Sequence, residues 1–135
     1  MVIKKLVTGF TLVELLIAIA IISILASIAY PSYLQFVSRS NRTEAQRELL
    51  RIANLQEQYY VDMRSYTNDM KKLGLNKDPF ITEKGYYSID ATLEKGGFVL
   101  TATALDPQKT NDSNCLKLSV NETGKKLPES ECWEQ

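Results

Sequence analysis

Histidine is absent from this 135-residue sequence. It is the commonest general base and metal ligand near neutral pH, so its absence removes the usual basis for acid–base or metal chemistry. The two cysteines, Cys115 and Cys132, cannot complete a four-ligand zinc site by themselves. The sequence also contains no phosphate-binding loop, nucleotide-binding glycine pattern or nucleophile–base pair. We therefore predict that the chain is not an enzyme and uses no cofactor, metal or small-molecule substrate.

An excess of charge of either sign is also missing. Sixteen lysines and arginines balance 16 aspartates and glutamates, so the formal net charge is zero. A protein that binds nucleic acid through its overall charge carries a basic excess. The balance therefore argues against general nucleic-acid affinity, and the length suits one modest domain core.

The apolar residues are concentrated at the start of the chain. Residues 15–30 carry no charge, and the apolar run extends back to Phe10 with Glu14 as its one interruption. A helix over residues 10–30 would be roughly 31 Å long, about the thickness of the hydrocarbon core of a bilayer. Lys4 and Lys5 precede this run, so we expect a single-pass segment with its N-terminus in the cytoplasm.

Three interpretations of this segment compete. It could be a secretory signal peptide, with residues 27–29 as a small-residue cleavage site, or a plain membrane anchor. Neither has a use for Glu14, because an acid inside an export helix costs about 2.5–3.5 kcal/mol near the centre and less toward an end. Cleavage before Phe10 would supply the use. It would create an α-amino group four residues away, and that amine on one subunit could neutralise the carboxylate of the next.

The stretch Gly9-Phe10-Thr11-Leu12-Val13-Glu14, with its apolar continuation to Pro31, resembles the class III signal of type IV pilins and type II secretion pseudopilins. The resemblance implies that prepilin peptidase cleaves between Gly9 and Phe10 and methylates the Phe10 amine. It also implies that Glu14 sets the filament register. The expected organisation is a leader at residues 1–9, a transmembrane and filament-core helix at 10–31, and a periplasmic or extracellular head at 32–135.

The sequence departs from the family pattern at one position. Many members carry a helix-weakening glycine eight residues before the proline, where this chain has Ser23. Pro31 is retained, and its missing N–H removes the hydrogen bond to the carbonyl of Ser27. We therefore predict a helix kink at Pro31.

The rest of the sequence predicts an α+β fold. Residues 32–65 lack proline and glycine and show an amphipathic helical pattern, with a charged face over 39–51 that suits solvent or, as the alternative, subunit contacts. A loop with one helical turn at 69–73 follows. Strands are expected at 86–93, 98–105 and 116–120, with tight turns at 96–97 and 121–124. The prediction is a long helix packed on a sheet of three or four antiparallel strands.

The two cysteines lie close to the C-terminus. In an exported domain, paired cysteines are favoured because the compartment is oxidising. We therefore predict a Cys115–Cys132 disulfide, which would stabilise the fold by roughly 3 kcal/mol. This segment looks like the disulfide-bounded C-terminal region of pilins.

The function indicated is that of a structural subunit, a minor pilin of a type IV pilus. Its expected partners are other pilin subunits, prepilin peptidase, the assembly platform and the inner membrane, from which the subunit would move to a pilus on the cell surface. Twitching motility, adhesion, DNA uptake and secretion share this N-terminal pattern. The alternatives are therefore a type II secretion pseudopilin and a tip-located pilin that binds DNA or mediates adhesion.

DNA is a possible partner but is not favoured by the charges near the C-terminus. Three lysines could meet phosphates there, and acids lie among them, so the local charge is mixed. The lysines are Lys117, Lys125 and Lys126, and the acids include Glu122, Glu129 and Glu131.

Overall fold

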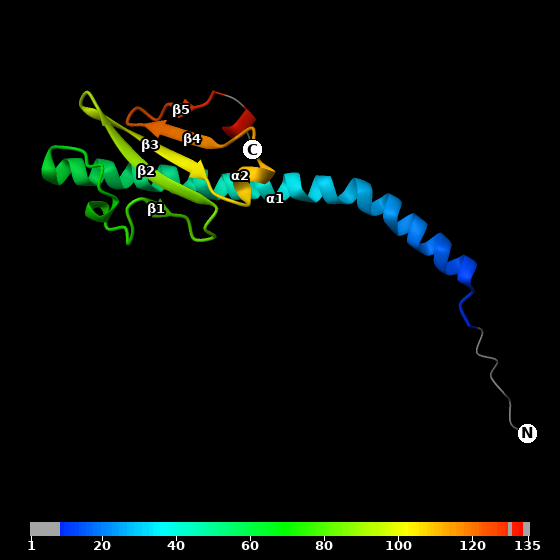
Figure 1. Ribbon diagram of the computed structural model, residues 1–135. Helices are drawn as coiled ribbons and strands as arrows, with labels where there is room; N and C mark the ends of the chain where they lie inside the picture. The colour runs from blue at the N-terminus through cyan, green and yellow to red at the C-terminus, as the bar shows by residue number, and fades with distance from the viewer. Residues whose placement is uncertain (1–8, 130, 134–135) are drawn as a thin grey trace, which may run out of the picture. The chain divides into compact units, whose positions relative to one another are not determined.

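The computed structural model describes residues 9–129 and 131–133. The chain divides between Leu34 and Gln35 into two compact units, and one long helix, α1 (Leu12–Met63), contributes residues to both (Figure 1). In the first unit, the apolar side chains of α1 are exposed almost throughout. By length and composition, α1 is the one helix among the described residues that could cross a membrane.

The helix is continuous through Pro31. Two serines in the apolar segment turn their hydroxyls onto helix carbonyls: Ser23 Oγ donates to the Ile19 carbonyl and Ser27 Oγ to the Ile24 carbonyl, both at 2.7 Å. Serines thus satisfy their polar groups within the helix, which suits an apolar environment. The kink at Pro31 stays a prediction.

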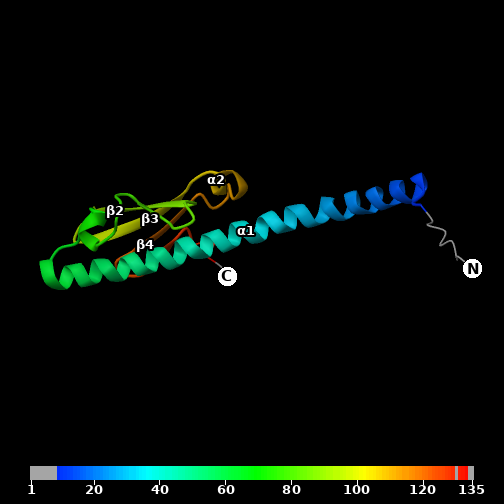
Figure 2. The ribbon, with the colours of Figure 1, turned by 90° about the horizontal axis from the view of Figure 1, so that it is seen from below.

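The second unit contains a five-stranded antiparallel meander. The strands are β1 (Phe80–Ile81), β2 (Tyr87–Glu94), β3 (Gly97–Ala104), β4 (Lys117–Asn121) and β5 (Lys126–Leu127), and they lie in that order across the sheet. Three short helices complete the unit: η1 (Met70–Leu73), α2 (Gln108–Asn111) and η2 (Glu131–Trp133). Figure 2 shows the sheet along one side of the C-terminal half of α1.

The core lies between that half of α1 and the sheet. Alternate residues of each long strand point to the helix, as the period of two requires. The buried set on the helix is Ala45, Leu49 and Ile52, and on the strands it is Tyr87, Ile89, Ala91, Phe98, Leu100, Ala102, Ala104, Leu118 and Val120. The opposite face carries polar residues, among which Thr101 and Ser119 share a hydroxyl hydrogen bond of 3.0 Å.

Gln56 is a polar residue on the buried stripe of α1. Its amide nitrogen donates to the Thr67 carbonyl, and its amide oxygen accepts from the Thr67 N–H at 3.1 Å. This reciprocal pair holds the loop that follows α1 against the helix. The helix ends at Met63, and the next residue, Arg64, adopts the left-handed conformation at φ 55°.

The α+β fold, the long helix and the helical turn near residue 70 are confirmed. The sheet has five strands where three or four were expected, because β1 and β5 join the three strands whose ranges were predicted. Strands of two residues are too short to show alternation. The hairpin turn also differs: Glu94 pairs with Gly97, so Lys95 and Gly96 form the turn.

Candidate functional sites at the helix start and at the disulfide

The start of α1 is closed by a reciprocal pair of hydrogen bonds between Thr11 and Glu14. Glu14 Oε2 accepts from the Thr11 N–H at 2.9 Å and from Thr11 Oγ1 at 2.7 Å. In return, Thr11 Oγ1 accepts from the Glu14 N–H at 3.2 Å. This is a capping box, which satisfies backbone donors that a helix start leaves free.

The capping box gives Glu14 a second physical reason to interrupt the apolar run. The acid lies in the first turn of the helix, where a carboxylate is stabilised by the helix dipole. The Thr-x-x-Glu spacing ahead of an apolar run is a helix-start signal that the sequence itself carries, although the role expected for Glu14 was only filament register. The structure shows that Glu14 serves the helix of its own chain.

Gly9 and Phe10 lie just before the first helical residue, outside regular secondary structure. The Phe10 side chain is 77% exposed, and no atom lies near the position that a side chain at Gly9 would occupy. Both residues are therefore exposed within the part of the chain that the structure describes. Residues 1–8, most of the expected leader, lie outside the described residues.

The predicted Cys115–Cys132 disulfide is confirmed, with the two Cα atoms 5.6 Å apart. Both cysteines are buried. The bridge joins η2 to the segment before β4, so it ties the C-terminal residues to the sheet.

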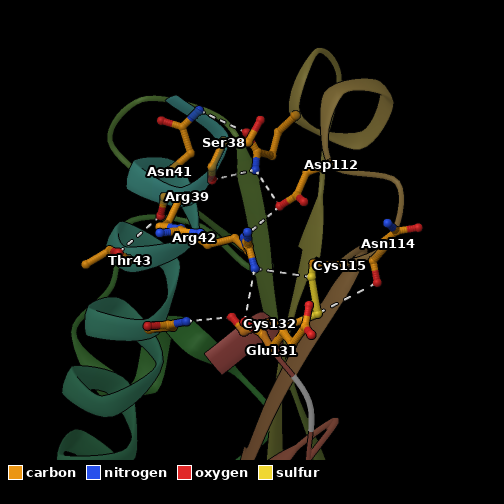
Figure 3. Close-up of polar contacts among 12 residues, drawn as sticks. Ser38, Arg39, Asn41, Arg42, Thr43, Asp112, Asn114, Cys115, Glu131 and Cys132 are labelled. Carbon is orange, nitrogen blue, oxygen red and sulfur yellow. Dashed lines mark hydrogen bonds and ion pairs between the residues drawn. A yellow bond between two sulfur atoms is a disulfide. The ribbon is translucent and has the colours of Figure 1, made fainter. Parts of the chain in front are cut away.

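Arg42 of α1 lies directly against this bridge (Figure 3). Its Nε is 2.9 Å from Asp112 Oδ2, and its Nη1 lies 3.3 Å from Cys115 Sγ and 3.5 Å from the Glu131 carbonyl. Gln46, one turn later, donates to the Cys132 carbonyl at 2.9 Å. The expectation that the whole charged face over 39–51 is solvated is wrong for Arg42, whose side chain is only 14% exposed.

Gln108 of α2 extends this polar contact to the sheet. Its amide nitrogen lies within hydrogen-bond distance of the Ser38 carbonyl, Tyr87 Oη and Asp112 Oδ2, at 3.0, 3.2 and 3.1 Å. Its amide oxygen accepts from Asn41 at 2.9 Å. The result is a buried network that fixes α2 on α1.

The network shifts two ionisable groups. Burial raises the pKa of Asp112, and this is opposed by the Arg42 guanidinium and by the hydrogen bond from Gln108. Burial also raises the pKa of Tyr87 to about 12, so its hydroxyl stays protonated at neutral pH. Asp112 serves as the ion-pair partner of Arg42. Among residues 9–129 and 131–133, no group of three His, Cys, Asp or Glu residues could hold a metal ion.

The three C-terminal lysines do not form one basic patch. Lys125 pairs with Glu129 at 3.2 Å, and the Lys126 ammonium lies 5.3 Å from the centre of the Trp133 ring. Lys126 pairs in register with Val120, and Lys117 lies three residues before Val120 on β4, so the two lysines belong to opposite faces of the sheet.

Comparisons with known proteins agree with this structure. A family model of the prokaryotic N-terminal methylation motif matches residues 4–30, and a model described as "Type IV minor pilin ComP, DNA uptake sequence receptor" matches residues 31–119. The solved structure of a type IV pilin from Shewanella oneidensis aligns with a TM-score of 0.55 at 27% identity. That alignment covers 73% of this chain and 99% of that one.

Several curated relatives are major pilins of other bacteria. The type IV major pilin PilE1 of Neisseria gonorrhoeae is 33% identical over 83% of this chain and 66% of its own length. The wide-pilus major component PilA4 of Thermus thermophilus is 43% identical over 53% of this chain and 56% of its own length. PilA of Myxococcus xanthus is 36% identical over 57% of this chain.

This chain spans a third of the Myxococcus relative and just under two thirds of the Neisseria one. The shared helix, sheet and N-terminal motif confirm the resemblance that residues 9–31 indicated. Because the ComP model alone matches more than half of the residues, the chain belongs to the type IV pilins, within the family of the minor pilin ComP.

Proposed function

We propose that this chain is a minor subunit of a type IV pilus that is held in the inner membrane and then moved into the filament. The proposal rests on the part of α1 that lies in the first unit. The large apolar side chains of residues 12–28 in this part are each more than half exposed. Such a surface needs lipid or neighbouring subunits to cover it. The exposed set includes Leu12, Val13, Leu15, Leu16, Ile17, Ile19, Ile21, Ile22, Ile24, Leu25 and Ile28.

The exposed residues before α1 and the match to the N-terminal methylation motif support a proposal about processing. We propose that prepilin peptidase cleaves between Gly9 and Phe10 and methylates the new amine, with Lys4 and Lys5 on the cytoplasmic side. Mass spectrometry of the mature protein should then find N-methylated Phe10 at its start. A mature chain that begins at Tyr30 would contradict the proposal and indicate an ordinary secreted protein.

Glu14 would set the register by pairing with the amine of an adjacent subunit. Its Oε2 is held by Thr11, and this hydrogen bonding fixes the carboxylate at the helix start. Two substitutions separate charge from capping. Glu14→Gln keeps an acceptor for the Thr11 N–H but removes the charge, whereas Glu14→Leu removes both.

We expect both variants to be cleaved and both to be depleted from sheared filaments, since register requires the charge. If Glu14→Gln enters filaments as well as the natural subunit and Glu14→Leu does not, capping is the role of Glu14 and the register assignment is wrong. Recovery of the protein with a secretion system, in place of sheared pili, would indicate the pseudopilin alternative.

The assembly platform is the partner expected when the subunit moves from the membrane into the filament. Motility and adhesion are tasks that such filaments carry out.

DNA uptake is a second candidate function, and the ComP model over residues 31–119 is the observation that favours it. It would make the chain a filament subunit with a binding role. Fluorescence anisotropy of the full chain in detergent, with labelled duplexes of several sequences and a series of salt concentrations, tests it. Selective binding that survives physiological salt would support a receptor. Equal, weak and steeply salt-dependent binding of all duplexes would refute it.

A further inference from the structure

One groove along α1 is basic. It has a volume of about 360 Å³ and lies between α1 and the loop after β1. Arg39, Arg47 and Lys84 are exposed at its rim, and none of them forms an ion pair with a residue that the structure describes. The Phe36 ring, 72% exposed, lies at one end, and the buried Glu44 lies at its floor.

A second groove along α1 is acidic. It has a volume of about 440 Å³ and lies between α1 and the turn from β4 to β5. Its charged residues are Glu57 and Glu122, and neither forms an ion pair within the described chain. Glu57 accepts a hydrogen bond from Tyr66 Oη at 3.1 Å. Leu50 lies in the groove and is 43% exposed.

The carboxylate of Glu122 lies over Gly97, so closely that a side chain on that glycine would overlap it. Gly97 thus leaves room for the acid beside the groove, where it forms no ion pair with a described residue. An unpaired acid in one groove and unpaired bases in the other are complementary in charge.

The two grooves lie at opposite edges of the sheet. β1, which precedes Lys84, is one edge strand, and β5, which follows the 121–124 turn, is the other. Figure 1 shows β1 and the β4–β5 pair on different sides of α1. Two different surfaces of one molecule that attract each other give a head-to-tail contact. Such contacts close into a ring or, where the rotation between copies does not close, extend into an open helical filament.

We propose that the basic groove of one copy receives the acidic groove of a second copy of this chain. This inference rests on the proposed filament function and names the contact between heads within it. The pairing sets Arg47 and Lys84 against Glu57 and Glu122 and covers Phe36 and Leu50. DNA is disfavoured as the occupant, because a phosphate backbone would leave both Phe36 at the basic groove and Leu50 at the acidic groove in water, whereas the pairing covers both side chains.

Charge reversal in matched pairs tests the contact. A base-reversed chain carries Arg47→Glu with Lys84→Glu, and an acid-reversed chain carries Glu57→Lys with Glu122→Lys. Full-length copies with two different tags are produced in the same cells, and capture of one tag after mild solubilisation reports the second. Each reversed chain with copies of its own kind should lose co-capture at least about tenfold relative to the natural chain.

Base-reversed and acid-reversed copies together should restore co-capture, because every contact in an alternating assembly then joins opposite charges. This rescue also shows that both variants are folded. The matched control is Lys71→Glu with Lys109→Glu, two exposed lysines outside both grooves, which should behave as the natural chain.

Failure of the mixture to associate would overturn the pairing. Normal co-capture of the base-reversed chain with copies of its own kind would also overturn the pairing of the grooves. If that chain in addition lost binding to a DNA duplex, the basic groove would be assigned to DNA. The proposed function is tested separately by the natural chain. If natural copies enter sheared filaments while reversal has no effect, only the groove pairing fails; if natural copies never enter filaments, the filament function itself fails.

Discussion

Replacing Arg42 by methionine tests whether the buried ion pair stabilises the head. Arg42 and Asp112 are joined at 2.9 Å, and their side chains are 14% and 10% exposed. Removing one partner leaves a carboxylate in a poorly hydrated site, which costs about 3–5 kcal/mol for a fully buried pair. We expect about 3 kcal/mol, the lower end, because both side chains retain some contact with solvent. For a head of this size that is a fall in Tm of roughly 12 °C.

The matched control is Arg51→Met. Arg51 and Glu48 are joined at 2.7 Å, a shorter distance, but this pair reaches the surface through Arg51, whose side chain is 45% exposed, while that of Glu48 is 17% exposed. Exposed pairs contribute about 0–1 kcal/mol, so this variant should unfold almost as the natural protein does. Comparing the two variants therefore shows whether the burial of the ion pair or its N–O distance determines the loss of stability. Urea or thermal unfolding followed by circular dichroism measures both.

The cost of Arg42→Met should depend on pH. Burial raises the pKa of Asp112 above the ordinary value of 3.8, and Arg42 opposes that rise. Without Arg42, the folded state binds the proton of Asp112 still more tightly than the unfolded state does. Protonation of Asp112 therefore favours the folded state of the variant. The loss of unfolding free energy caused by Arg42→Met is complete at a pH above the pKa of Asp112 in the folded variant. It becomes smaller as the pH falls through that pKa toward 3.8.

Two results would refute this reasoning. One is a loss of stability from Arg42→Met no greater than that from Arg51→Met. The other is a deficit that stays constant from neutral pH down to pH 4, which would mean that the uncompensated charge of Asp112 is not its cause.

Three further predictions concern the same head. Replacing Cys115 and Cys132 together by serine should lower the free energy of unfolding by about 3 kcal/mol, and reductant should then have no added effect on the variant in denaturant titrations. Leu49→Ala, at a fully buried position, should cost about 2–5 kcal/mol, and a smaller loss in thermal unfolding would mean that the core collapses around the cavity. Arg64→Gly should raise stability by up to about 1 kcal/mol, since Arg64 has φ 55°; a lower Tm would show that its side chain outweighs that strain.

Features that depend on residues close together along the chain can be predicted from the amino-acid sequence. The apolar run, the amphipathic half of α1 and the alternation in β2 and β3 are periodic patterns, so contacts three or four residues apart in the helix and two apart in the strands are readable from them. The capping box between Thr11 and Glu14 is of the same local kind and could have been read from its spacing.

Contacts between residues far apart along the chain become known from the folded structure. Arg42 and Asp112 are 70 positions apart, and nothing in their local patterns shows that burial joins them while Arg51 stays at the surface. The order of the strands likewise separates Lys84 from Glu122, leaving the two unpaired charge groups at opposite sheet edges. Local sequence encodes periodicity, whereas the pairing of distant charges follows from how the sheet folds onto the helix, and that arrangement is set by the packing of the whole core.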